Sequence, residues 1–147
     1  MDKYIINENT ILIMPFEKKS KVIETYITYI IDNSVMNIID ESCKYYGSNL
    51  IGRIKSTKYL TGLSTKLPIV ISEKYNLIFF PTTSYKNDKC IWINYHSIIE
   101  YYSNNKQHIN ILLNNEKRIT LDVSNNVFNK QLFKASRLET ILKRNNK

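Results

Sequence analysis

The feature that most constrains the fold is a succession of short segments rich in β-branched and aromatic residues, which recur between residues 4 and 123. Such segments, separated by polar or glycine-containing stretches, are typical of β-strands. We therefore expect strands at residues 4–7, 10–16, 21–31, 68–72, 77–80, 90–94, 98–102, 108–113 and 118–123. The last three are expected to form an antiparallel meander, with residues 114–116 as a hairpin turn.

Residues 34–46 show helical spacing instead, because their apolar side chains recur at intervals of three and four. Asp32 or Asn33 can cap the start of this helix, and Gly47 can cap its end. Residues 48–66, by contrast, contain two glycines, scattered polar groups and no sustained period. We expect a long connection there with one further helical turn, and connections of that length in compact domains are usually functional or mobile.

A second amphipathic helix is expected at the C-terminal end, where Ser124 or Asn125 supplies the N-cap. Its core-facing stripe comprises Phe128, Leu132, Ala135, Leu138 and Leu142. Basic side chains occupy another face of the same helix, namely Lys130, Lys134, Arg137 and Arg144. A phosphate contact, a dimer contact and plain solvation are all compatible with that basic face.

Length and composition agree with a single folded domain at residues 1–147. The apolar fraction of 43% excludes wholesale disorder, and three glycines and two cysteines exclude collagen-like and disulfide-scaffold classes. We expect an α+β fold, with a mostly antiparallel curved sheet or partly open barrel, one inserted helix and a C-terminal amphipathic helix. A pleckstrin-homology-like barrel fits the second half. Without a long apolar run or a signal-peptide layout, we expect a soluble cytoplasmic protein with no membrane partner.

The charge is distributed unevenly along the chain. The formal net charge is +8, but residues 1–42 carry −3 and the remainder carries +11. Residues 44–72 contain no acidic residue, and residues 130–147 hold six basic residues against one acidic residue. The basic residues of the first stretch are Lys44, Arg53, Lys55, Lys58 and Lys66. Such a surface suits nucleic acid or an anionic membrane, and it also suits a solvated face with no partner.

The groups that an enzyme or a metal site needs do not occur in any usual pattern. Residues 47–54 copy a phosphate-binding loop only superficially, because Arg and Ile stand where Lys and Ser or Thr are needed. His96 and His108 lack the spacing of metal ligands, and no serine lies in a nucleophile elbow. Cys43 and Cys90 match no zinc spacing, and we interpret both as reduced core residues. We therefore expect no enzymatic activity, cofactor or metal.

The centre of the chain contains four distinctive strings, ESCKYYGSNLIGR at 41–53, LPIVIS at 67–72, IFFPTT at 78–83 and CIWINYHSI at 90–98. In order and spacing they resemble the ComK competence transcription factor family of low-G+C Gram-positive bacteria. That family shows a Ser-Cys-basic-aromatic-aromatic-Gly run, a Gly-Arg pair, a Pro-rich strand, an aromatic-Pro-Thr strand end and a Cys-x-Trp strand. The resemblance is specific over residues 42–98 and extends more loosely over most of the chain.

The resemblance implies a sequence-specific double-stranded DNA-binding activator of competence genes, which recognises A/T-rich boxes through the minor groove. It also implies a homodimer or a pair of dimers, contact with RNA polymerase and association with the nucleoid. Narrow A-tract grooves attract Arg and Lys, while Ser and Asn reach the acceptors on A·T edges. We therefore expect DNA contacts from Lys44, Ser48, Asn49, Arg53, Lys55, Lys58 and Lys66.

The aromatic residues of the matching strings can serve as core residues or as wedges between bases, and we expect core packing. They are Tyr45, Tyr46, Phe79, Phe80 and Trp92. The sequence departs from the family pattern at Leu50, where an aromatic residue is expected. It also lacks the aromatic-Met-Leu-Tyr-Pro-like tail through which an adaptor presents longer members for proteolysis, so we do not expect that partner.

Two other classes of function stay open. A module that binds RNA or single strands without sequence preference would expose aromatic side chains on one face of a sheet. The sequence argues against this, because Ile109, Ile111 and Leu113 alternate as an aliphatic, buried strand face. A pleckstrin-like interaction domain would instead bind anionic liposomes as well as DNA.

Overall fold

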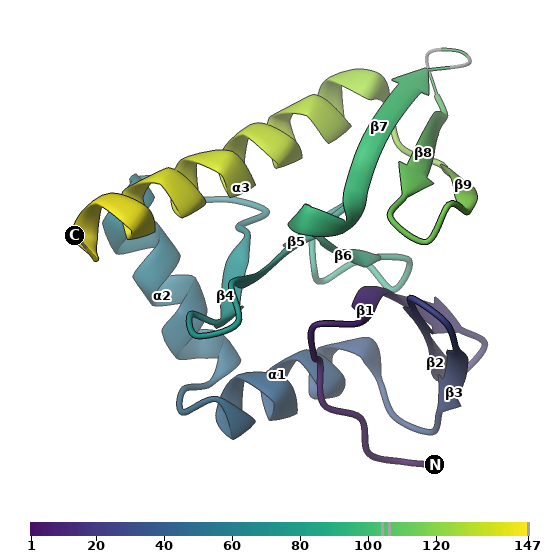
Figure 1. Ribbon diagram of the computed structural model, residues 1–147, viewed down its shortest axis with the longest axis horizontal. Helices are drawn as coiled ribbons and strands as arrows, with labels where there is room; N and C mark the ends of the chain where they lie inside the picture. The colour runs from purple at the N-terminus through teal and green to yellow at the C-terminus, as the bar shows by residue number, and fades with distance from the viewer. Residues whose placement is uncertain (104, 106, 147) are drawn as a thin grey trace.

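The computed structural model describes residues 1–103, 105 and 107–146, and in this part of the chain three α-helices and nine strands form an α+β fold (Figure 1). Six strands make an antiparallel sheet in the order β3-β2-β1-β6-β5-β4. They are β1 (Thr10–Phe16), β2 (Lys19–Glu24), β3 (Thr28–Ile31), β4 (Ile69–Ser72), β5 (Leu77–Pro81) and β6 (Trp92–Asn94). After the 3-10 turn η1 (Tyr95–Ser97), a second antiparallel sheet contains β7 (Ile98–Ser103), β8 (Ile109–Leu113) and β9 (Arg118–Leu121).

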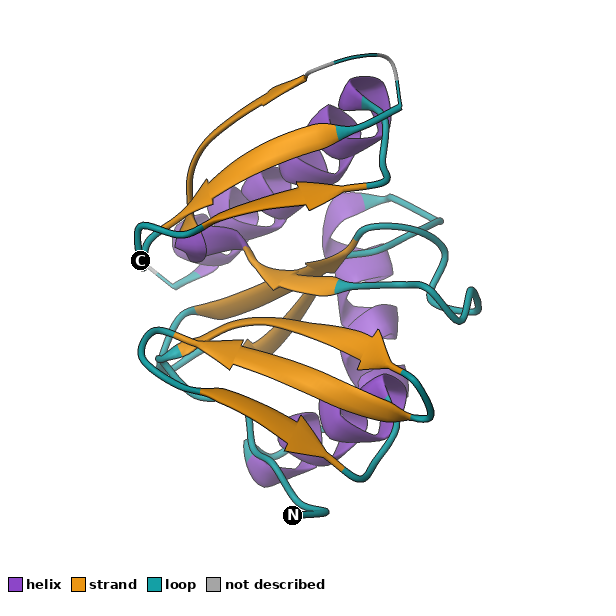
Figure 2. Cartoon of the chain, turned by 90° about the vertical axis from the view of Figure 1, so that its right-hand side faces the viewer, coloured by secondary structure: helices purple, strands orange, loops and turns teal. Residues whose placement is uncertain are grey.

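The helices pack against both faces of the six-stranded sheet. α1 (Val35–Tyr45) and α2 (Leu50–Thr61) follow β3, and α3 (Asn125–Asn145) follows β9. In Figure 2 the strands face the viewer and the helices lie behind them. The α+β class and the C-terminal helix are confirmed. The sheets do not close into a barrel in the described part of the chain, so the pleckstrin-like barrel is wrong, and β7, β8 and β9 form an open sheet instead.

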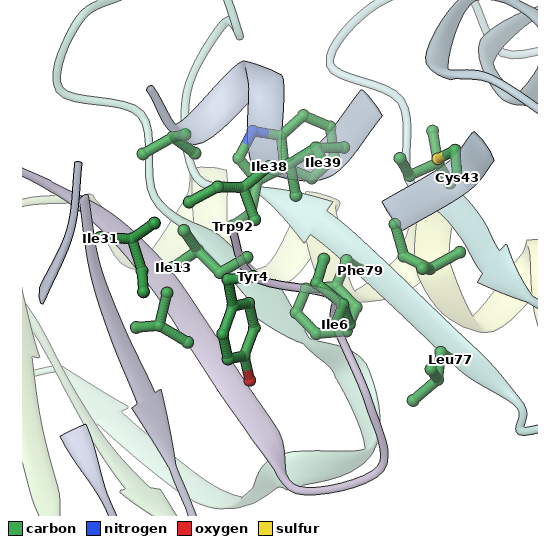
Figure 3. Packing of buried hydrophobic residues seen from close by; sticks show 14 of the residues in the cluster. Tyr4, Ile6, Ile13, Ile31, Ile38, Ile39, Cys43, Leu77, Phe79 and Trp92 are labelled. Carbon is green, nitrogen blue, oxygen red and sulfur yellow. The ribbon is translucent and has the colours of Figure 1, made fainter. Parts of the chain in front are cut away.

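Buried side chains form two clusters on opposite faces of the six-stranded sheet. Phe79 and Phe80 are neighbours in β5 and therefore point to opposite faces. Phe79 packs with Trp92 and the buried side of α1 in the first cluster (Figure 3). Phe80 joins the second cluster, where its ring lies 5.8 Å from that of Phe128 on α3. Strand β5, the second from one edge of the sheet, is thus buried on both faces and lies between the two clusters.

Helix α1 forms as its spacing predicts, with Ile39 and Cys43 fully buried. Its N-cap is Ser34, not Asp32 or Asn33. The Ser34 backbone is extended, and its hydroxyl accepts a hydrogen bond of 3.1 Å from the backbone N–H three residues on. Asn33 instead uses its side-chain oxygen to accept the N–H of Ser34 at 2.9 Å, which orients the capping residue.

The strand expected at residues 4–7 is absent from the sheets of the described chain. The segment is held by side chains of α1 instead. The N–H of Ile6 donates to the hydroxyl of Ser42 at 3.0 Å, and its carbonyl accepts from the hydroxyl of Tyr46 at 2.7 Å. These contacts satisfy both backbone groups of Ile6 without a neighbouring strand.

The single strand expected at residues 21–31 is also wrong, because this segment belongs to the β2–β3 hairpin. A hydrogen bond of 2.8 Å from the N–H of Glu24 to the carbonyl of Ile27 closes the turn. Tyr26 at its tip is 90% exposed. The uninterrupted strand propensity of this segment, without glycine or proline, conceals the turn in the sequence.

The largest correction concerns residues 48–66, where a twelve-residue helix replaces the expected connection. Asn49 caps its start, because its side-chain oxygen accepts the N–H of Gly52 at 2.6 Å. Gly62 ends it in the left-handed conformation at φ +74°. Thr57 and Thr61 are the buried residues of this helix, and Leu50, Ile54 and Leu60 pack partly buried against the two clusters. Its inner side is therefore a mixture of hydroxyl and apolar side chains, which gives only a weak apolar period.

Candidate nucleic-acid interface

Helix α2 exposes two of the five basic residues in the segment that the sequence marks. Its buried threonines face inward, so the residues about half a turn away face solvent. These exposed residues, which we call the α2 face, are Ile51, Lys55, Ser56, Lys58 and Tyr59. Tyr59 is 89% exposed. The face therefore combines two lysines one turn apart with a hydroxyl and two apolar side chains.

Hydroxyl groups attach the inner side of α2 to the rest of the fold. The Thr57 hydroxyl lies 2.8 Å from the carbonyl of Pro68 and 3.1 Å from that of Arg53. The Thr61 hydroxyl donates to the carbonyl of Thr57 at 2.7 Å. Because Pro68 directly precedes β4, the buried hydroxyl of Thr57 ties the helix to the six-stranded sheet.

The corner between α1 and α2 is built around Asp40. One carboxylate oxygen accepts the N–H of Leu50 at 3.0 Å, and the other lies 3.1 Å from Lys44 Nζ. The Leu50 hydrogen bond, followed by Lys44, holds the pKa of Asp40 below its ordinary value of 3.8. A carboxylate at the start of α2 also interacts favourably with the helix dipole. Lys44, which also lies 4.0 Å from Glu41, is therefore partly neutralised.

Of the other residues that the sequence assigns to this corner, Ser48 and Asn49 have structural partners. Ser48 continues the turn that Gly47 begins at φ +96°, and its N–H donates to the carbonyl of Cys43 at 2.9 Å. The side-chain oxygen of Asn49 accepts the hydrogen bond that caps the start of α2. Arg53 is half-buried, and its Nε is buried without a hydrogen-bond partner among the described residues.

Lys55 and Lys58 are therefore the two predicted contact residues that the structure places on one exposed face. Arg53 points to the inner side of the helix, and its charge opposes the effect of burial at Cys43, which raises the pKa of that thiol to about 11. Lys66 lies beyond the end of α2, close to α3. Lys55 and Lys58 are three residues apart in the sequence. That spacing predicts a shared face only when the segment is known to be helical.

The predicted core role of the aromatic residues is confirmed for Phe79, Phe80 and Trp92, which are fully buried. Tyr46 packs against the first cluster. Tyr45 is the exception, because it is 69% exposed and its ring meets that of Tyr46 edge-on at 5.0 Å. Its position in the last turn of α1 directs it away from the apolar stripe.

The remaining sequence candidates lie elsewhere. Cys43 and Cys90 are free thiols and are buried, as expected. His96 pairs with Glu139, and His108 lies 3.5 Å from Asp122. Within residues 1–103, 105 and 107–146, no group of three or more potential metal ligands comes together, and no helix has the length and apolarity needed to cross a membrane.

The fold and its exposed lysines define a basic α+β protein with a helical face suited to a polyanion. The chain matches the ComK protein family over residues 1–147, and it belongs to that family. A curated relative, the competence transcription factor of Bacillus subtilis (strain 168), is 28% identical over 144 residues, which cover 95% of this chain and 75% of the relative. No solved structure gives a significant match. Family membership confirms the resemblance and supports a role in the regulation of transcription.

Proposed function

We propose that the protein is a sequence-specific, double-stranded DNA-binding transcription regulator of competence genes, and that the α2 face contacts A/T-rich boxes through the minor groove. The observation that carries the proposal is the exposure of Lys55 and Lys58 on one face of a helix within a segment free of acidic residues. The relative's description as a competence transcription factor supports the same reading.

The dimensions of DNA restrict how this face can bind. A helix with its side chains is about 10–12 Å across, whereas the minor groove of B-DNA is about 6 Å wide. Helix α2 therefore cannot enter the groove, and only its side chains can. We expect the helix to lie over the rims, with Lys55 and Lys58 reaching the phosphates or the electronegative groove floor, as lysines do at A-tracts.

The exposed aromatic residues favour this reading over a single-strand-binding module. Such a module stacks bases on aromatic side chains that share one face. Among the described residues, the large aromatics that are exposed within strands are Phe16 and Tyr102, and these belong to different sheets. Tyr59 is exposed on α2, where it can pack against a sugar-phosphate rim. We expect the active species to be a homodimer or a pair of dimers at the nucleoid.

The proposal is tested by titrating the protein at fixed salt against a duplex with two A-run/T-run boxes and against a G/C-substituted duplex of equal length. We expect a preference of about tenfold or more, equivalent to about 1.4 kcal/mol, which a minor-groove competitor abolishes. The variant Lys55→Gln/Lys58→Gln should weaken binding to the box duplex, and the slope of log affinity against log salt should fall by about 1.8 if both lysines meet phosphates.

The matched control is Lys18→Gln/Lys19→Gln, which removes the same charge from exposed residues in the β1–β2 turn and at the start of β2. Its affinity and salt slope should stay close to those of the unmodified protein. Equal binding to both duplexes would remove sequence selectivity from the proposal. An equal loss of affinity in the control variant would show that net charge, and not the α2 face, determines binding.

A further inference from the structure

A second basic cluster lies where the end of α2 meets α3, apart from the α2 face. Figure 1 shows the end of α2 against α3, and the two helices are in contact. The cluster, which we call the α2–α3 cluster, consists of Lys66, Lys130, Lys134 and Arg137. Three of its members come from the basic face of α3, whose role the sequence leaves open.

Backbone carbonyls at the end of α2 hold two of these side chains in place. Lys134 Nζ donates to the carbonyl of Thr65 at 2.6 Å, and Arg137 Nε donates to the carbonyl of Thr61 at 3.3 Å. Neither bond neutralises a charge. The two cations are therefore positioned by neutral groups, and the remaining N–H donors of both side chains stay available to a partner.

The backbone of Lys66 is held in an unusual conformation. Its φ of +48° lies in the left-handed region, which disfavours residues other than glycine, asparagine and aspartate by roughly 1–2 kcal/mol. Gln131, a buried residue of α3, donates to the carbonyl of Lys66 at 2.9 Å and to that of Pro81 at 2.8 Å. This clamp keeps the lysine beside α3 despite the strain.

The cluster brings like charges together without acidic partners. Burial lowers the pKa of Lys134, and the charges of Lys66 and Lys130 lower it further. Among the described residues, no ion pair joins any member of the cluster to a carboxylate. Glu139, the acidic residue of α3, is engaged with His96 and with Lys143 at 3.5 Å. An anion bound here would relieve the mutual repulsion of the lysines.

We propose that the α2–α3 cluster binds the phosphate backbone of duplex DNA flanking the box that the α2 face contacts. The inference rests on the proposed function for its ligand and adds a second contact region. Its contacts go to phosphates, so they position the protein without carrying sequence information. The cluster should therefore raise affinity equally for A/T-rich and G/C-rich duplexes.

The test uses the full chain with Lys66→Asn/Lys130→Gln, which removes two charges and places at position 66 a residue that tolerates the left-handed region. Lys18→Gln/Lys19→Gln is the matched control. Affinity is measured as a function of salt on a box duplex with long flanks and on one trimmed to the box. Circular dichroism establishes that each variant is folded.

We expect the variant to lose affinity by a similar factor on box and G/C-substituted duplexes, with a salt slope lower by about 1.8. Trimming the flanks should weaken the unmodified protein severalfold and the variant little. An unchanged salt slope and an equal response to trimming would overturn the inference, even where the unmodified protein prefers A/T boxes. If the unmodified protein shows no preference but the slope still falls, the proposed selectivity fails and the phosphate contact stands.

Discussion

Helices α1 and α2 are neighbours in sequence and similar in length, but they bury opposite kinds of side chain. α1 places Ile38, Ile39 and Cys43 in the first hydrophobic cluster. α2 buries Thr57 and Thr61 and leaves its largest apolar residues partly or fully exposed. Burial of apolar surface is the main source of stability in a fold. The comparison therefore shows that α1 contributes more buried apolar surface to stability than α2, whose outer face carries the exposed lysines.

The largest effect that separates the two helices should come from truncating an apolar residue in each. Ile39→Ala in α1 should lower the free energy of unfolding by about 2–5 kcal/mol, because it removes buried methyl groups and leaves a cavity. Ile51→Ala in α2, where the side chain is 68% exposed, should change it by less than about 0.5 kcal/mol. Urea denaturation measures both. Comparable losses would show that α2 contributes to the core as α1 does.

A smaller effect should come from the polar attachment of α2. Thr57→Val keeps the size of the side chain but leaves the buried carbonyl of Pro68 without its hydrogen bond, and we expect a loss of about 1–2 kcal/mol. The control is Thr140→Val, whose hydroxyl donates to the carbonyl of Ser136 on the exposed side of α3. Thermal unfolding should separate the variants. A melting temperature for Thr57→Val as high as that of Thr140→Val would show that the Thr57 hydroxyl does not stabilise the attachment of α2.

The smallest effect concerns the corner that joins the two helices, and it depends on pH. Asp40→Ala should cost about 1 kcal/mol at neutral pH, because the first turn of α2 loses a capping carboxylate. The folded state lowers the pKa of Asp40, so its stabilisation is present above the ordinary value of 3.8 and is lost as the pH falls through the lowered pKa. Urea denaturation of both proteins should therefore give converging stabilities in acid.

Glu41→Ala is the control for that measurement, because Glu41 is exposed and lies 4.0 Å from the same lysine. Its stability should change little at any pH. A difference between Asp40→Ala and the unmodified protein that stays constant from neutral pH into acid would contradict the proposed role of the carboxylate.

The contrast between the helices also explains how far the sequence predicts the fold. The spacing of apolar residues in α1, α3 and most strands predicts these elements, because their stability comes from one buried stripe or face. It predicts α2 poorly, because the inner side of this helix mixes buried threonines with partly buried Leu50, Ile54 and Leu60. The capping residues Asn49 and Gly62 mark the true ends of α2, but alone they resemble the polar and glycine residues of a loop.

The candidate site, like the fold, is predicted by the sequence only in part. Charge alone marks Lys55 and Lys58 within the basic segment, and the structure places both on an exposed face, while their contact with DNA stays a prediction. The pairing of Lys44 with Asp40 follows from their i, i+4 spacing in the predicted helix. Charge cannot show that Arg53 is half-buried or that Lys66 meets α3, because these depend on helix orientation and long-range packing. The α2–α3 cluster joins residues more than sixty positions apart in the chain, which no local pattern reveals.

The most direct test of the central claim is a footprint of lysine reactivity. The protein is acylated sparingly with and without the A/T-box duplex, and mass spectrometry measures the modification of each lysine. The account predicts that the duplex protects Lys55 and Lys58 severalfold and leaves Lys18 and Lys19 unchanged. Protection of Lys18 and Lys19 with unchanged reactivity at Lys55 and Lys58 would contradict the assignment of α2 to the DNA-binding surface.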